Sequence, residues 1–276
     1  AQLSGETVTL LRDVSNQSSI TLTSGKSAVI DLNGFDIGFA QNQRFGVRGG
    51  SLHITGEGKV YEEAPYYAPI VIVGSDDPVE NYSVVTVDQN VTLEGWSGIF
   101  IGVTADGNSH AYGVKVTMNG TIHSVRDTSG YGGHGVYING FNKDTTGPYP
   151  QITLGETSKI TSVGNGIYAA GFAEWNLAGD ITAADALSIK SGIFHITGGT
   201  YHSTGEFADP ADANGNGSEN TGAALSITSN QGYAKKIEVT VTGGTFISDN
   251  GYALYEGIAV DEDNVPAAPE SYAVLS

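Results

Sequence analysis

The sequence predicts an all-β solenoid, in which short strands coil around one shared core. The clearest repeat runs over 186–201 (ALSIKSGIFHITGGTY), and its two parts return over 224–230 (ALSITSN) and 239–246 (VTVTGGTF). In Phe194–Thr197 (FHIT), apolar and polar residues alternate with period two, which is typical of a strand with one buried face. Two strand types that recur in the same order favour a solenoid. The alternative is a β-sandwich, which also uses short strands and Gly-rich turns.

Short alternating runs give the expected strands in chain order. The early runs are 8–11, 19–22, 28–32, a strand–turn–strand over 46–60, 70–73, 84–87 and 91–94. A second column of runs begins each time with Gly or Ala: 98–101, 135–138, 166–169, 186–189 and 224–227. Paired glycines, as in Gly198-Gly199, turn the chain where a side chain would hinder it.

Polar segments that contain Gly or Pro separate these strands. The expected loops are 62–69, 106–112, 126–134 and 142–150. We expect one domain over 1–276, in which 1–62 form the N-terminal coils or cap. Residues 205–221 are a long loop insertion, and 257–276 are a C-terminal tail that leaves the solenoid.

The composition of the chain limits the classes of partner that it is expected to bind. The 276 residues include 39 Gly, 30 acidic and 12 basic residues and no Cys, with a formal charge of −18. Such a surface repels phosphate backbones, so we expect no nucleic-acid partner. No apolar run is long enough to span a membrane, so we expect no membrane insertion. A Thr-, Asn- and Gly-rich acidic β protein without cysteine suits an extracellular location, either secreted or attached to the cell surface.

One stretch carries a resemblance to a known family. Ile30–Gly34 (IDLNG) followed by Gly50–Gly58 (GSLHITGEG) resembles the opening of right-handed parallel β-helix domains in bacterial surface proteins, which are pectin-lyase-like. The Gly-Gly-Thr-Tyr/Phe closures at 198–201 and 243–246 are similar to later coils of that family. The resemblance extends from about Thr7 to Glu256 and implies a single-stranded right-handed parallel β-helix. Its members include lyases and hydrolases, glycan binders and adhesin stalks.

An aromatic row is the first candidate site. When the second column is aligned by its Gly or Ala start, one outward register position holds Phe100, Tyr137, Tyr168, Ser188 and Ser226. Rungs of a parallel sheet lie about 4.8 Å apart, so adjacent coils would make these rings a flat exposed platform for sugars. Asn139 and Lys190, two positions further on, would supply hydrogen bonds to the ligand. The alternative is that long loops cover the row and the aromatic rings only pack there.

A calcium site is the second candidate. Asp212, Asn214 and Asn216, followed by Gly217, match the first half of an EF-hand calcium loop. The position that should hold the bidentate Glu is Ala223, so the match is incomplete. The alternative is a solvated insertion, and we expect no cofactor to be required apart from this structural calcium.

A catalytic site is the third candidate. Gly133-His134-Gly135 resembles the Gly-His-Gly element of β-helical polygalacturonases, whose acid and base are carboxylates. That resemblance makes Asp106 and Asp127 the partners of His134. The Asn-Thr-Asp and Asp-Asp elements of the family are missing. For a lyase, Lys190 near Asp185 is the suggestive pair.

Together these features favour a non-catalytic bacterial module for glycan or matrix binding or for adhesion. Its partners would be a polysaccharide, a host or matrix glycan, or a protein. The alternative function is a carbohydrate-active enzyme, a polysaccharide lyase or glycoside hydrolase on the same scaffold. An enzyme should gather three or more carboxylates and a base in one groove, whereas a binder should show the aromatic platform with few titratable groups.

Overall fold

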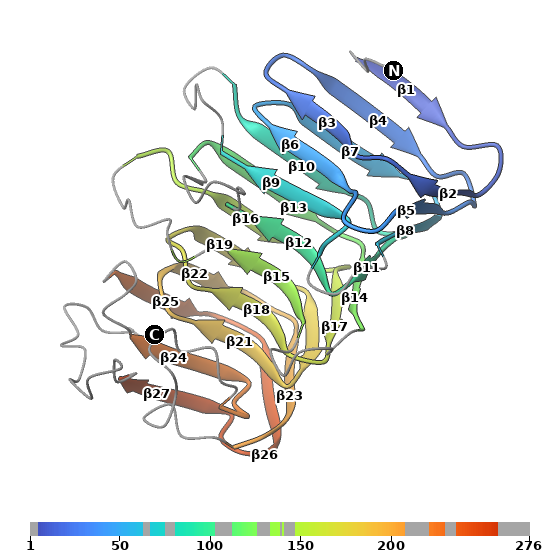
Figure 1. Cartoon of the computed structure of the whole chain (residues 1–276). Helices are drawn as coiled ribbons and strands as arrows, with labels where there is room; N and C mark the ends of the chain where they lie inside the picture. Colours follow the sequence, from blue (N-terminus) through green and yellow to red (C-terminus); the bar gives the residue numbers. More distant parts are fainter. Residues whose placement is uncertain are drawn as a thin grey trace.

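The chain forms a right-handed parallel β-helix (Figure 1). The computed structural model describes residues 5–62, 67–74, 81–102, 112–125, 133–138, 140, 147–207, 221–229 and 236–258. These residues contain no helix, and hence none that could cross a membrane. Each coil adds one strand to each of three parallel nine-stranded sheets, here named A, B and C, and the coils stack along one axis. The predicted fold class is thus confirmed.

The three sheets repeat in chain order. Sheet A contains β1 (Glu6–Thr9), β4 (Ser27–Asp31), β7 (Ser51–Thr55), β10 (Ser83–Val87), β13 (Val114–Met118), β16 (Gln151–Leu154), β19 (Glu174–Leu177), β22 (Gly192–Ile196) and β25 (Ile237–Val241). Sheet B contains β2 (Val14–Gln17), β5 (Ile37–Phe39), β8 (Gly58–Glu62), β11 (Val91–Gly95), β14 (Thr121–Ser124), β17 (Lys159–Ser162), β20 (Asp180–Ala183), β23 (Thr200–Glu206) and β26 (Thr245–Asn250). Sheet C contains β3 (Ile20–Thr23), β6 (Phe45–Arg48), β9 (Ile70–Val73), β12 (Ser97–Ile101), β15 (His134–Ile138), β18 (Asn165–Ala169), β21 (Asp185–Ile189), β24 (Leu225–Ser229) and β27 (Leu254–Ile258).

The core is built from inward rows in which each residue pairs with the equivalent residue of the next coil. In sheet A one such row is apolar over all nine strands: Val8, Ile30, Ile54, Val87, Met118, Leu154, Leu177, Ile196 and Val241. Its central members are almost completely buried. The alternation in the sequence places these side chains inward, and the in-register stacking then lets each coil bury the apolar face of its neighbour.

Register also stacks aromatic rings inside the core. Trp175 pairs with Phe194 between β19 and β22, and their rings lie 5.5 Å apart and nearly parallel. Tyr201 and Phe246 stack in the same way between β23 and β26, at 5.1 Å. Large side chains at one register position therefore meet face to face.

Four sequence-based boundaries need correction. The predicted loop 126–134 is too long, because His134 is the first residue of β15. The predicted loop 62–69, the insertion 205–221 and the tail 257–276 begin too early, because β8 extends to Glu62, β23 to Glu206 and β27 to Ile258. In each place the chain pairs with a neighbouring coil, a contact that local composition does not indicate.

Glycine is the second residue of several strands of sheet C, because the chain passes close to sheet B there. At Gly135, a Cβ atom would overlap the side chain of Ile160, and at Gly166 it would overlap Ile181. At Gly166 it would also lie 2.6 Å from the carbonyl oxygen of Ala186. A backbone atom in a stacked coil cannot move aside without disturbing the ladder.

We therefore expect Gly166→Ala to lower the free energy of unfolding by about 1–3 kcal/mol through overpacking. The matched control is Gly198→Ala, because the nearest atom to a Cβ there lies 3.7 Å away, an ordinary contact. Urea denaturation of both variants checks the prediction. Equal stability of the two variants would contradict the close packing at Gly166.

Candidate functional site

The outer face of sheet C brings the predicted aromatic row together. Phe100 on β12 pairs with Tyr137 on β15, and Tyr137 pairs with Tyr168 on β18. The same register position continues as Ser188, Ser226 and Tyr255 on the next three strands. The ring centroids of Phe100 and Tyr137 lie 4.3 Å apart, and those of Tyr137 and Tyr168 lie 5.3 Å apart with ring planes only 5° from parallel.

The three rings of this row differ in their exposure to solvent. Phe100 and Tyr137 are half-buried, whereas Tyr168 is only 4 % exposed. The expectation of a platform of three exposed rings is therefore wrong at Tyr168. Its ring is covered by the imidazole of His134, stacked at 5.0 Å, and the Lys190 ammonium lies 5.8 Å from its centroid. Of the three predicted rings, Phe100 and Tyr137 are accessible.

His134 is packed into the row among other rings. Its ring lies 5.3 Å from the rings of both Trp96 and Tyr137. Burial lowers the pKa of His134 to about 4, although a side-chain hydrogen bond with Asn165 partly opposes this shift. Its Nδ1 is buried and has no hydrogen-bond partner among the described residues. The imidazole is therefore neutral near neutral pH and carries no charge to a ligand.

Asp185 anchors the chain where it returns to sheet C at residue 221. Its carboxylate accepts hydrogen bonds from the Thr221 amide at 2.8 Å, the Thr221 hydroxyl at 3.0 Å and the Gly222 amide at 2.6 Å. Burial raises the pKa of Asp185 to about 6, while these hydrogen bonds and the charge of Lys190 act in the opposite direction. These contacts tie β21 to the segment that leads into β24.

Lys190 is also buried, at 3 % exposure. Its Nζ donates to the Thr228 hydroxyl at 2.7 Å. The expectation that Lys190 reaches out to a ligand is therefore not matched by its position, because the side chain is buried and its ammonium is bonded to Thr228. The suggested pairing with Asp185 is present as an electrostatic interaction.

The remaining predicted site residues lie outside the described residues. They are Asp106, Asp127, Asn139, Asp212, Asn214 and Asn216. The carboxylate partners of His134 and the calcium loop stay predictions. Within the described residues, no group of three or more His, Asp or Glu side chains is placed to hold a metal ion.

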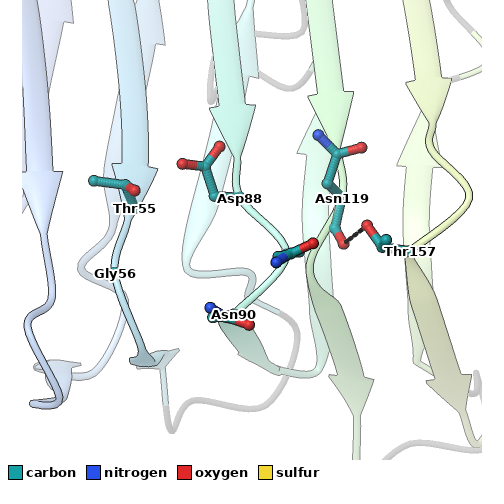
Figure 2. Close-up of a pocket in the computed structure, with 7 residues that line it drawn as sticks. Thr55, Gly56, Asp88, Asn90, Asn119 and Thr157 are labelled. Atoms are coloured by element: carbon teal, nitrogen blue, oxygen red, sulfur yellow. Dashed lines mark hydrogen bonds between the residues drawn. The ribbon is translucent and has the colours of Figure 1, made fainter.

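A second candidate surface, which is polar, lies at the corner between sheets A and B. Figure 2 shows Thr55, Asp88 and Asn119 side by side where β7, β10 and β13 end, with Asn90 and Thr157 completing an open hollow of about 340 Å³. The Thr157 hydroxyl donates to the Asn119 carbonyl at 2.8 Å, which joins two coils.

Chemically, this corner hollow offers hydroxyl, amide and carboxylate oxygens. Asp88 Oδ2 lies 3.0 Å from Nε2 of His53, so this carboxylate already has a partner on the outer face of sheet A. None of the described residues that line the hollow is aromatic, so they offer a sugar ring no surface on which to stack. The aromatic row therefore remains the stronger candidate site.

Sequence reasoning missed the corner hollow and the anchoring role of Asp185. A signal for the hollow was present, because Asp88 and Asn119 follow sheet A strands at equivalent positions. Asp185 gave no signal, because its partners Thr221 and Gly222 lie far along the chain.

No protein-family model, curated protein or solved structure gives a significant match to the chain. The functional argument therefore depends on the geometry of the fold and its outer faces.

The burial of His134 predicts a pH-dependent stability. Unfolded histidine binds a proton near pH 6.5, whereas His134 in the fold resists protonation until about pH 4. Falling pH between these values therefore favours the unfolded state, by about 3 kcal/mol in total. We expect His134→Phe, which keeps a ring in the stack, to lose this dependence.

The measurement is the free energy of unfolding of wild type and His134→Phe between about pH 7 and pH 4. Asp185 works in the opposite sense, because its raised pKa makes protonation favour the fold as pH falls through about 6. The informative quantity is thus the difference between the two proteins, in which the contribution of Asp185 cancels. Parallel pH profiles would show that the His134 imidazole is not buried as described.

Proposed function

We propose that this protein is a non-catalytic extracellular recognition module that binds a glycan on the outer face of sheet C. The observation that carries the proposal is the contact between the half-buried rings of Phe100 and Tyr137, 4.3 Å apart on adjacent coils. Aromatic faces with a few well-placed polar groups bind ligands that combine an apolar face with hydroxyls, as pyranose rings do.

The charges of the chain and around the site favour a ligand without strong negative charge. The chain carries a formal charge of −18, which opposes phosphates and polyanionic chains. Asp185 and Lys190, the charged side chains behind the row, are both buried and interact with each other. Among the described residues, few titratable groups lie around the aromatic surface, which favours recognition over acid–base chemistry.

The fold is consistent with a place on the cell surface. We propose that the chain is a pectin-lyase-like β-helix of the kind found in bacterial surface and secreted proteins. Its role would be adhesion to a polysaccharide or to a host or matrix glycan. The support is the resemblance of Ile30–Gly34 and Gly50–Gly58, together with the confirmed parallel β-helix.

Glycan cleavage is the second candidate function. Its candidate acid is Asp185, whose pKa burial raises to about 6, beside Lys190; because both side chains are buried, the chain would have to open there before a substrate could reach them. Incubation of the protein with any glycan that it binds, followed by analysis of chain length and of new unsaturated ends, tests this function. Shortened chains that Asp185→Asn no longer produces would establish an enzyme, and intact chains would leave recognition alone.

We expect Tyr137→Ala to weaken glycan binding roughly tenfold, because one stacking ring is lost from the accessible part of the row. Tyr137 is the right position because Tyr168 is buried, and truncating Tyr168 would also open a cavity. Binding to the strongest ligand from a glycan array, measured by isothermal titration calorimetry, checks the prediction.

The matched control is Tyr149→Ala, since Tyr149 is also half-buried but packs edge-on against Phe172, away from the row. It should bind the glycan as wild type does, and thermal melts should show that both variants fold. The same loss of affinity in both variants, or in neither, would refute the aromatic row as the binding site.

A further inference from the structure

The last described coil carries a charged residue at an inward position where the earlier coils carry an apolar one. On β27, the last strand of sheet C, this residue is Glu256, and its side chain is exposed. The same register position is apolar and at most 6 % exposed on the eight earlier strands, where it holds Leu22, Val47, Ile72, Ile101, Ile138, Ala169, Ile189 and Ile227.

The first described coil shows the same exception in sheet A. On β1, an inward register position holds Glu6, which is also exposed. In the later coils this position is apolar and at most 2 % exposed, and it holds Ala28, Leu52, Val85, Val116, Ile152, Trp175, Phe194 and Val239. The first and last coils lie at opposite ends of the stack (Figure 1), so each end of the core carries one inward carboxylate.

Apart from these carboxylates, both ends have the features of a surface that pairs with another chain. Among the described residues, β1, β2 and β3 at one end and β25, β26 and β27 at the other have a strand neighbour on one side only. Such edge strands are templates for pairing with further strands. Inward side chains are also accessible there, because Leu254 is 47 % exposed and Val8 and Val241 are only partly buried.

A head-to-tail contact between two copies would continue the order of the coils. β25 of one copy would pair with β1 of the next copy, and β27 would pair with β3, in the register that joins successive coils. Such a contact does not close on itself, so it grows into an open filament. In that register Glu6 would be buried against Val239, and Glu256 would be buried against Leu22.

Burial of either carboxylate would cost more free energy than the apolar contacts around it return, because an ionised group without a partner loses its water. The buried carboxylates inside the fold are compensated. Glu62 accepts a hydrogen bond from the Asn42 amide at 2.9 Å, and Asp185 accepts three hydrogen bonds. Glu6 and Glu256 form no hydrogen bond or ion pair with any described residue.

We propose that Glu6 and Glu256 prevent copies of this chain from stacking end to end. The alternation of each strand directs both carboxylates toward the core side, so a second copy cannot cover either end without stripping water from a charge. An outward carboxylate such as that of Glu238 imposes no such cost, because it stays in water. The proposal concerns the two ends of the solenoid and is independent of glycan binding on sheet C.

The test is the molar mass of the full chain, measured by sedimentation velocity over a range of concentrations. Wild type should keep a constant mass as its concentration rises. The double variant Glu6→Val with Glu256→Ile restores both apolar rows, and its average mass should rise roughly twofold or more with concentration. A wild type that itself grows into filaments, or a double variant that behaves as wild type does, overturns the proposal.

Two control proteins separate the inward carboxylates from the formal charge of −18. Glu156→Val with Glu238→Ile removes two charges from exposed positions outside the inward rows and should keep the wild-type mass. Glu6→Lys with Glu256→Lys lowers the long-range repulsion further but keeps an ion in each row, so it should not assemble. Assembly of either control would assign the effect to net charge and refute the role of the inward position. Thermal melts should show that all of these variants fold.

Discussion

The in-register stacking of coils is the constraint on which this structure depends. Each residue lies beside the equivalent residue of the coils before and after it, so one register position becomes a continuous row. Inward rows are then mostly apolar, and the row from Val8 to Val241 is apolar along its whole length. Glycine is required where two sheets meet too closely for a side chain, as at Gly135 and Gly166. A single strand gains little by itself; it is stable because both neighbours repeat its pattern.

The same constraint arranges the outward-facing aromatic side chains. Aromatic residues at one outward register position, as at Tyr137 and Tyr168, stack in nearly parallel fashion. Rings contributed by turns and strand ends, such as Phe207 and Tyr252, escape this register and meet at a large angle. The fold thus offers two kinds of aromatic surface, flat along the sheet and angular at its end.

The periodic part of this account could be predicted from the sequence. Alternation in stretches such as Phe194–Thr197 predicted the strands, and the shared Gly or Ala starts predicted that Phe100, Tyr137 and Tyr168 would align. The burial of Tyr168 and Lys190 could not be predicted in this way. A strand's own pattern fixes which side faces outward, but exposure there depends on side chains from other coils, such as His134 above Tyr168. Residues in the turns between strands, including those of the corner hollow, gave only weak signals in the sequence.

A crystal structure of the protein with its tightest-binding oligosaccharide tests the central claim most directly. Phe100 and Tyr137 form the most accessible stretch of the aligned aromatic row, and no sequence relative offers independent guidance. The account predicts a pyranose ring in van der Waals contact with the face of Tyr137, on the outer side of sheet C. A sugar bound instead in the corner hollow beside Asp88 and Asn119, with the aromatic row empty, would contradict it.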